Sequence, residues 1–132
     1  MWKHEHEIEV RFRDCDPMGH VNNAVYLTYL ESARLSWWRA AFGPDGLRDH
    51  GVILARVEID YRRPAFPGDR LVVRLRVVRI GQSSFTVAYE IVNARTRELV
   101  AEAVSVQVAY DYTQGRSAPL SPQLRARLEA AL

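Results

Sequence analysis

The chain has one cysteine, Cys15, and so cannot form an internal disulfide, which is typical of proteins in a reducing compartment. No apolar run approaches the roughly 18 residues of a membrane-spanning helix. The first residues also lack the apolar core of a signal peptide. Its 18 basic and 16 acidic residues form no block of one sign, so we expect neither nucleic acid nor membrane as a partner. These absences predict a cytoplasmic protein.

With 132 residues, 48% of them apolar, the chain is long enough to bury one hydrophobic core. It shows no internal repeat, no linker and no shift in composition along its length. We therefore expect one domain over residues 1–132.

Alternation of apolar and polar residues predicts five strands. In the first, Ile8, Val10 and Phe12 share one side, and in the last, the valines from Val104 to Val108 alternate with Ser105 and Gln107. The short links between the last three strands suit antiparallel neighbours. The predicted strands cover residues 6–12, 52–63, 70–80, 84–92 and 99–112.

Between the first two strands, apolar residues recur at spacings of three and four and predict one long helix. Asn22 or Asn23 can cap its start, and Gly43 followed by Pro44 can end it. Residues 113–120 read as a polar loop, and residues 121–132 as a short helix capped by Ser121. The apolar stripe contains Tyr26, Tyr29, Leu30, Ala33, Trp37, Ala40 and Ala41. One apolar helix against one antiparallel sheet is an α+β arrangement.

The loop that leads into this helix holds the densest group of chemically active residue types. Asp16 lies just before the helix start, where unpaired backbone N–H groups stabilise a developing oxyanion. Hydrolysis of an activated acyl group requires such a carboxylate and such amides together. A carboxylate at a helix start is more often an ordinary cap, and Asp14 is the simpler candidate for that role.

Other arrangements compete with this one. His20 on its own is typical of a hydrogen-bonded loop histidine, and Glu31 can form an ion pair with Arg34 on the helix surface. A thiol nucleophile at Cys15 is disfavoured because neighbours along a chain rarely face one another. His4 and His6 share a strand face, but without a third ligand we expect no metal site. No cofactor motif is present.

Three stretches resemble the 4-hydroxybenzoyl-CoA thioesterase-like family of hot-dog-fold proteins. The first and most specific is RDCDPMGHVNNAVYLTYLESAR, residues 13–34. Two supporting matches follow in the family's order, YRRPAFPGD at residues 61–69 and GQSSF at residues 81–85.

The resemblance implies a sheet curled around the long helix and an acyl-CoA substrate. It implies homodimers that join two sheets edge to edge, which often pair into homotetramers, with active sites lined by both subunits. Asp16 takes the position of the family's nucleophile or general base, and the backbone amide of Asn23 that of the oxyanion donor.

The same resemblance implies where the substrate lies. Ser83 and Ser84 are placed to contact the pantetheine arm of CoA. Arg62, Arg63 or Arg79 can meet its phosphates, because a guanidinium suits phosphate oxygens; a solvated strand end is the simpler role for any one of them. We further expect Tyr26, Glu31 and His20 to shape the pocket. Subfamilies differ at the position of His20, so its role stays open.

The resemblance therefore predicts an acyl-CoA thioesterase, through either a general-base or a covalent mechanism. One alternative is a thioesterase acting on acyl-carrier protein. Another is a non-catalytic acyl-CoA binding domain, since one fold serves several functions. A dehydratase is disfavoured because the His-Phe-Pro pattern is absent. The acyl group itself is not predicted, since it depends on how Trp37, Trp38, Phe42 and the loop 43–51 pack.

Overall fold

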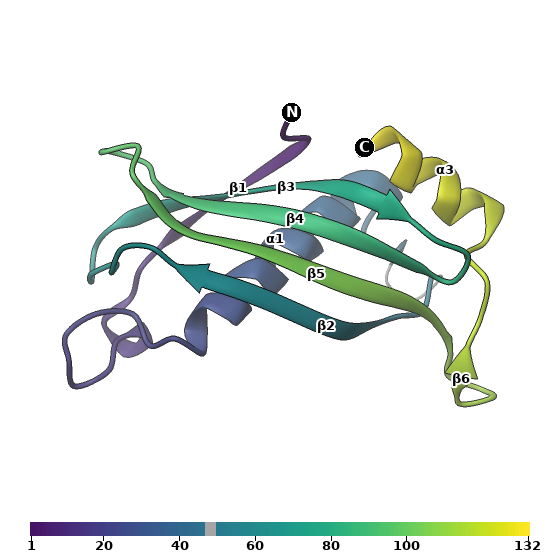
Figure 1. Ribbon diagram of the computed structural model, residues 1–132, viewed down its shortest axis with the longest axis horizontal. Helices are drawn as coiled ribbons and strands as arrows, with labels where there is room; N and C mark the ends of the chain where they lie inside the picture. Colours follow the sequence, from purple (N-terminus) through teal and green to yellow (C-terminus); the bar gives the residue numbers. More distant parts are fainter. Residues whose placement is uncertain (47–49) are drawn as a thin grey trace.

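The computed structural model describes residues 1–46 and 50–132 (Figure 1). Its elements are β1 (His4–Glu9), a 3₁₀ helix (Phe12–Asp14), α1 (Val25–Phe42), β2 (Val52–Tyr61), β3 (Arg70–Ile80), β4 (Ser84–Asn93), β5 (Leu99–Asp111), β6 (Arg116–Ser117) and α3 (Pro122–Ala130). The predicted α+β order of one strand, a long helix, four strands and a short helix is confirmed. The predicted loop 43–51 includes residues 47–49, which lie outside the described residues.

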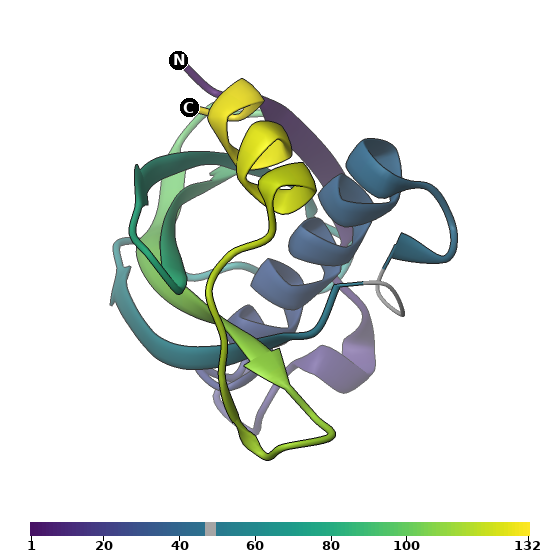
Figure 2. The same cartoon turned by 90° about the vertical axis from the view of Figure 1, so that its right-hand side faces the viewer.

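The strands form one antiparallel sheet in the order β1-β3-β4-β5-β2, with β6 paired to β5. Register shifts place an extra residue in β2, β3 and β5, and such bulges bend and twist a sheet. The end-on view shows the strands as a curved layer with α1 on its concave side (Figure 2). This is the hot-dog arrangement that the resemblance implied.

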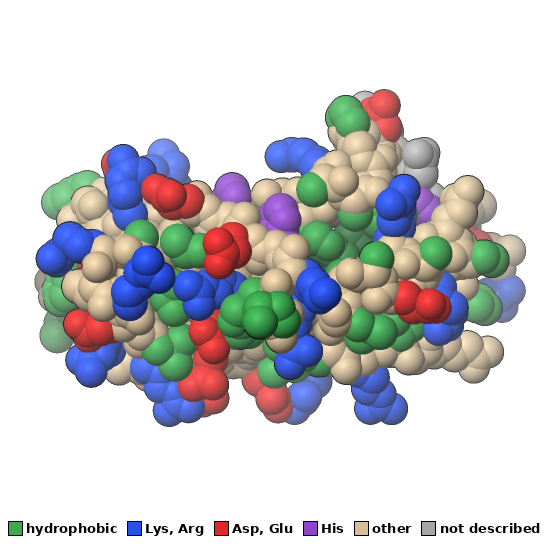
Figure 3. Space-filling model, turned by 90° about the horizontal axis from the view of Figure 1, so that it is seen from above, with side chains coloured by type: hydrophobic (Ala, Val, Ile, Leu, Met, Phe, Trp, Pro, Cys, Tyr) green, Lys and Arg blue, Asp and Glu red, His purple; other side chains and the backbone are tan. Residues whose placement is uncertain are grey.

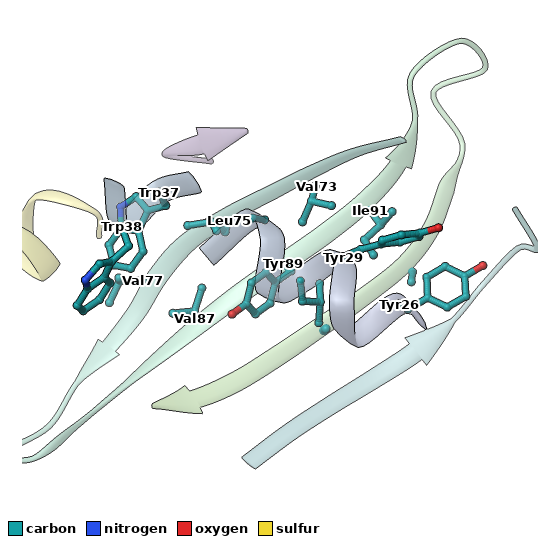
Figure 4. Packing of buried hydrophobic residues seen from close by; sticks show 14 of the residues in the cluster. Tyr26, Tyr29, Trp37, Trp38, Val73, Leu75, Val77, Val87, Tyr89 and Ile91 are labelled. Atoms are coloured by element: carbon teal, nitrogen blue, oxygen red, sulfur yellow. The ribbon is translucent and has the colours of Figure 1, made fainter. Parts of the chain in front are cut away.

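The core lies between α1 and the concave face of β3 and β4. One side of each strand is buried against the helix, while the arginines of β3 lie on the convex side. Tyr29 and Trp37 of α1 lie in one buried cluster with the aliphatic side chains of these strands (Figure 4). The alternating residues of β3 and β4 that are buried, as the alternation predicted, are Leu71, Val73, Leu75, Val77, Phe85, Val87, Tyr89 and Ile91.

The helix stripe is confirmed with one shift at its end. Trp38 is buried, whereas Ala40 is exposed. Trp38 packs on Phe42 and Phe85, at ring-centroid distances of 4.9 and 6.3 Å. The helix ends at Gly43, whose φ of 81° lies in the region that favours glycine and whose N–H donates to the Arg39 carbonyl.

Two local expectations were wrong. The first strand ends at Glu9 instead of residue 12, and Phe12 is 85% exposed rather than facing the core. The reason is local: Arg11 donates its N–H to the Asp14 carboxylate and starts a 3₁₀ turn in place of the strand. The stretch read as a loop over residues 113–120 contains the short strand β6.

In β5, polar side chains face the helix and valines face outward, the reverse of the usual arrangement. Ser105 and Gln107 are almost fully buried on the side that faces the helix. The valines that alternate with them, Val104, Val106 and Val108, are half-buried on the convex face. The register with β4 decides this, because Ser105 pairs with Val87, whose side chain faces the helix. Polar atoms thus lie in the core near the middle of α1.

No helix in the described part of the chain is long and apolar enough to cross a membrane.

Candidate active site

Asp16 lies in a tight turn that precedes α1. Its N–H donates to the His20 carbonyl at 3.1 Å, and its own carbonyl accepts from the Gly19 N–H at 2.9 Å. Gly19 has a φ of 87°, which a residue with a β-carbon rarely adopts. An isolated bridge between Cys15 and Val21 closes the base of the turn. The turn therefore holds Asp16 at a fixed position relative to the helix.

The Asp16 carboxylate is half-buried and held at both oxygens. Oδ1 accepts from the Met18 N–H at 2.9 Å, and the side-chain amide of Asn22 donates to Oδ2 at 3.5 Å. The first bond orients the carboxylate, and the second is long and ties it loosely to the helix start. Asn22 was expected only as a helix cap, so its contact with Asp16 was missed.

The turn that leads into α1 leaves the backbone N–H of Asn23 free beside this carboxylate within the described residues. The Asn22 side chain accepts from the Ala24 N–H at 2.9 Å, and the Asn22 carbonyl accepts from the Val25 N–H. Asn22 therefore holds the turn that leads into the helix, but the N-cap position is Ala24, whose side chain makes no capping hydrogen bond, so the predicted cap at Asn22 or Asn23 was wrong by one or two residues. Asn23 is exposed, and its N–H makes no hydrogen bond within the described residues. Such an amide is available to a ligand.

Asp16 and Asn23 line one open cavity of about 390 Å³. Six of the ten predicted site residues meet there. The cavity is lined by Asp16, His20, Val21, Asn23, Tyr26, Tyr61, Arg62, Arg63 and Pro64.

Tyr61 is a polar lining residue that the sequence did not single out, although it begins the second matching stretch. Its hydroxyl donates to the Asn23 carbonyl at 2.9 Å, and its ring meets that of Tyr26 edge-on at 5.2 Å. Burial raises the pKa of Tyr26, so this hydroxyl stays protonated at neutral pH. Tyr61 thus anchors the Asn23 carbonyl, in the peptide unit next to the one that carries the free N–H, and Tyr26 packs against the Tyr61 ring.

Asp14, two residues before Asp16, has a structural role. It is 5% exposed and accepts from the Arg11 N–H, the Arg11 guanidinium and the Tyr29 hydroxyl. Burial by itself would raise the pKa of Asp14, but these hydrogen bonds outweigh burial and lower it. Asp14 therefore joins the loop to the second turn of the helix and leaves Asp16 as the carboxylate in the cavity.

The competing arrangements find little support. The Cys15 thiol lies 3.8 Å from the Arg11 carbonyl, whereas the His20 ring lies 3.3 Å from the Val21 carbonyl. Burial and the nearby carboxylates of Asp14 and Asp16 raise the pKa of Cys15, which disfavours a thiolate. Among residues 1–46 and 50–132, no group of three His, Cys, Asp or Glu side chains is arranged to hold a metal ion.

The arginines at the cavity carry exposed ion pairs. Arg62 lies 2.8 Å from the Glu102 carboxylate and 3.8 Å from that of Asp60, and Arg63 lies 2.7 Å from Glu98. Exposed pairs of this kind contribute little and exchange readily for another anion. Both arginines can therefore turn toward a phosphate.

The other predicted residues lie elsewhere in the chain. Arg79, Ser83 and Ser84 lie at the β3–β4 connection, at the end of the sheet opposite the start of α1 (Figure 1). Glu31 is exposed and lines a second cavity farther along the helix. Its expected ion pair with Arg34 does not form within the described residues, because Arg34 donates to the Tyr89 hydroxyl instead.

Comparisons with known proteins identify the family of the chain. Residues 10–128 match the family model of the thioesterase-like superfamily. The chain is 29% identical over 125 residues to the long-chain acyl-CoA thioesterase FadM of Escherichia coli (strain K12), covering 93% of this chain and 95% of that protein.

Solved structures give the same result. A thioesterase from Thermus thermophilus, complexed with coenzyme A and Zn, is 38% identical with a TM-score of 0.86, over 97% of this chain and 98% of that one. A 1,4-dihydroxy-2-naphthoyl-CoA thioesterase from Synechocystis is 26% identical with a TM-score of 0.86, over 95% and 94%. The chain therefore belongs to the thioesterase-like superfamily and is a thioester hydrolase.

Proposed function

We propose that the chain hydrolyses acyl-CoA thioesters to a free acid and CoA in the cavity at the start of α1. The observation that carries this proposal is the convergence of two groups on one cavity, the anchored Asp16 carboxylate and the free Asn23 amide. Relatives and solved neighbours named for CoA thioesters support the choice of carrier.

In the general-base route, Asp16 takes a proton from a water molecule as the water oxygen attacks the thioester carbon. The carbonyl oxygen gains negative charge and accepts a hydrogen bond from the Asn23 N–H. The tetrahedral intermediate then collapses, the C–S bond breaks, and the CoA thiolate leaves and is protonated.

In the covalent route, an Asp16 oxygen attacks the thioester carbon and expels the CoA thiolate, which leaves a mixed anhydride for water to hydrolyse. Single turnover in oxygen-18 water separates the two routes. Label that enters the Asp16 carboxylate excludes simple base catalysis.

The rest of the cavity would hold the substrate. His20 and Tyr26 line the wall beside Asp16, and Arg62 and Arg63 lie where the phosphates of CoA can exchange with their present carboxylate partners. The carrier remains open to test. Turnover of one acyl group on CoA and on acyl-carrier protein discriminates the two substrates.

We also propose a homodimer formed through the free edge of β2, and a homotetramer as its further assembly. Among the described residues no strand covers this edge, and Ile53, Leu54 and Tyr61 on β2 are 41–46% exposed. A two-fold axis at that edge pairs the two β2 strands antiparallel, so the partner's sheet runs in the opposite direction. The partner's β3–β4 connection, with Arg79, Ser83 and Ser84, then comes to the same end of the joined sheet as Asp16, where CoA would extend.

Replacing Asp16 by Asn tests the site. The Asn side chain keeps an oxygen for the Met18 amide but is neither a base nor a nucleophile, so we expect kcat to fall by at least about a hundredfold. Steady-state hydrolysis of several acyl-CoAs measures the loss.

A suitable control is Asp45→Asn, which changes an exposed carboxylate in the loop after α1 and is expected to leave kcat unchanged. Near-normal activity of a folded Asp16→Asn variant would refute the assignment of Asp16.

A further inference from the structure

Asn22 lies between the two groups that the proposed reaction uses. Its side-chain Oδ1 accepts from the Ala24 N–H at 2.9 Å, and its Nδ2 donates to Asp16 Oδ2 at 3.5 Å. The peptide bond that follows Asn22 carries the free N–H of Asn23. One residue therefore contacts the carboxylate with its side chain and supplies the carbonyl half of the peptide unit that holds the oxyanion donor.

The orientation of the Asn22 amide follows from its two partners. A backbone N–H needs an oxygen as its acceptor, so the side-chain oxygen faces Ala24 and the NH₂ group is left facing Asp16. The opposite orientation would bring two donors together at Ala24 and two acceptors together at Asp16. Asn22 therefore presents an N–H donor to the carboxylate.

The backbone of Asn22 is held on both sides. Its N–H donates to the Asp14 carbonyl, and its carbonyl accepts from the Val25 N–H, both at 3.0 Å. The second bond fixes the plane of the Asn22–Asn23 peptide, because the carbonyl and the N–H of a trans peptide lie in one plane and point in opposite directions. The free Asn23 N–H therefore has a fixed direction, away from Val25.

Asn22 also supplies one of the two contacts that orient the Asp16 carboxylate. The Met18 N–H holds Oδ1 at 2.9 Å, and among the described residues Asn22 makes the only hydrogen bond to Oδ2. Rotation about the Cβ–Cγ bond of an aspartate has no sharp preference, so one contact alone would leave the carboxylate free to turn. The 3.5 Å separation is long, as catalytic hydrogen bonds often are before substrate binds.

We propose that Asn22 is a positioning residue that holds the Asp16 carboxylate and the Asn23 amide in a fixed relation around the reacting carbonyl. The inference rests on the proposed hydrolysis at Asp16. The Asn22 side chain is not among those that line the cavity, so it acts through Asp16 rather than on the substrate. Loss of its contact with Asp16 lowers kcat and leaves KM unchanged.

Two substitutions separate this role from that of a residue that only holds the turn. Asn22→Ser and Asn22→Asp both keep an oxygen that accepts from the Ala24 N–H, but serine is too short to reach Asp16 and aspartate has no N–H. With decanoyl-CoA and benzoyl-CoA as probes, we expect kcat of Asn22→Ser to fall about tenfold, the effect of one net hydrogen bond. A residue that only holds the turn would leave kcat near the wild-type value in both variants.

Asn22→Asp has a further signature in the pH profile. Its second oxygen takes the place of Nδ2 beside Asp16, and a like charge there favours protonation of one of the two carboxylates, so we expect the acid limb of kcat/KM to move to higher pH by about one unit or more. Asn22→Ser should leave this limb in place. Besides the two tyrosines of the cavity, the charged or titratable groups that line it or lie within two residues of Asp16 are unchanged in both variants: Asp14, Cys15, His20, Arg62 and Arg63.

Asn93→Asp is the matched control. Asn93, at the end of β4, is half-buried like Asn22, and its Oδ1 likewise accepts from the N–H two residues on, that of Arg95, at 2.9 Å. The substitution adds the same charge to the same kind of turn. We expect its kcat and pH profile to match those of the wild-type protein.

A double substitution tests whether Asn22 acts through Asp16. If it does, Asn22→Ser in the Asp16→Asn background causes no further loss of kcat, because effects of residues that act as a unit do not add. A further tenfold loss in that background, or unchanged kcat in both single variants, overturns the proposal. Failure of both single variants to fold, seen by thermal unfolding, would show that Asn22 only holds the turn and overturns it as well.

The two proposals fail separately. Loss of hydrolysis in Asp16→Asn, together with wild-type kcat in both Asn22 variants, would leave the catalytic site in place and remove only the role of Asn22. Near-normal hydrolysis by a folded Asp16→Asn variant would remove the catalytic site itself.

Discussion

At the scale of single residues, the two carboxylates before α1 show how the environment separates roles that the sequence leaves adjacent. Asp14 is closed off from solvent by the hydrogen bonds of Arg11 and Tyr29, whereas Asp16 faces an open cavity. The motif resemblance chose Asp16, but spacing alone would have allowed either. The partner that decides the role of Asp14 is Tyr29, 15 residues away along the chain.

Tyr29→Phe removes the only hydroxyl from this contact. A hydrogen bond to a charged group contributes about 1.5–3 kcal/mol, so we expect the free energy of unfolding to fall by that amount. Urea unfolding at neutral pH measures it.

Tyr112→Phe is the matched control, because Tyr112 is 66% exposed and, within residues 1–46 and 50–132, its hydroxyl makes one long contact of 3.4 Å. Its effect is expected to stay within about 0.5 kcal/mol. Equal effects of the two variants would contradict a structural role for the Asp14–Tyr29 bond.

At the scale of elements, β5 and β2 show features that depend on strand pairing. The alternation in β5 predicts a strand without saying which set of residues faces the helix, and pairing with β4 places Ser105 and Gln107 inward. In β2, a bulge between Leu54 and Arg56 shifts the side chains along the edge. Both depend on neighbours far along the chain.

Ile53→Lys tests the β2 edge as the dimer contact. A lysine on an edge strand opposes edge-to-edge pairing, so we expect the particle mass in sedimentation to shift from dimer or tetramer toward monomer. Activity should fall with it, since the proposed site draws on both subunits.

Val78→Lys changes a residue of similar exposure, 38%, on the interior strand β3. We expect this control to keep the β2-edge dimer. If instead Val78→Lys gives monomers and Ile53→Lys does not, the interface lies on the convex face of the sheet.

At the scale of the whole molecule, charge is distributed without a dominant sign. Basic and acidic side chains intermingle over the face seen from above (Figure 3), in keeping with a formal net charge of +2. Such a surface exerts little long-range attraction on an anion. Recognition of CoA would therefore depend on arginines close to the cavity.

Acid stability of the whole molecule should depend on Asp14. Its pKa in the fold lies below the ordinary value of 3.8, so its stabilising effect is present above that pH and is lost as the pH falls through the lower, folded-state pKa. We expect Asp14→Asn to be less stable than the wild-type protein at pH 7 and to lose less stability between pH 7 and pH 2.

Urea unfolding across this range, with Asp45→Asn as the control, measures the difference. Parallel pH curves for Asp14→Asn and the wild-type protein would contradict this account of Asp14.

The sequence by itself determined the elements and the location of the catalytic loop. Apolar spacing reflects which face of a helix or strand is buried, and the turn around Asp16 is built from contacts with Met18, Gly19 and His20, close neighbours in the chain. Local patterns of this kind are written in consecutive residues.

Only the tertiary structure decided which side of β5 faces the helix, that Tyr61 anchors the Asn23 carbonyl, and that Gln107 lies in the core with its side-chain nitrogen bonded to Ser105. Each of these follows from strand register or from packing between segments far apart in sequence. A shift of one residue in register exchanges the two faces of a strand, and alternation alone is identical for both outcomes.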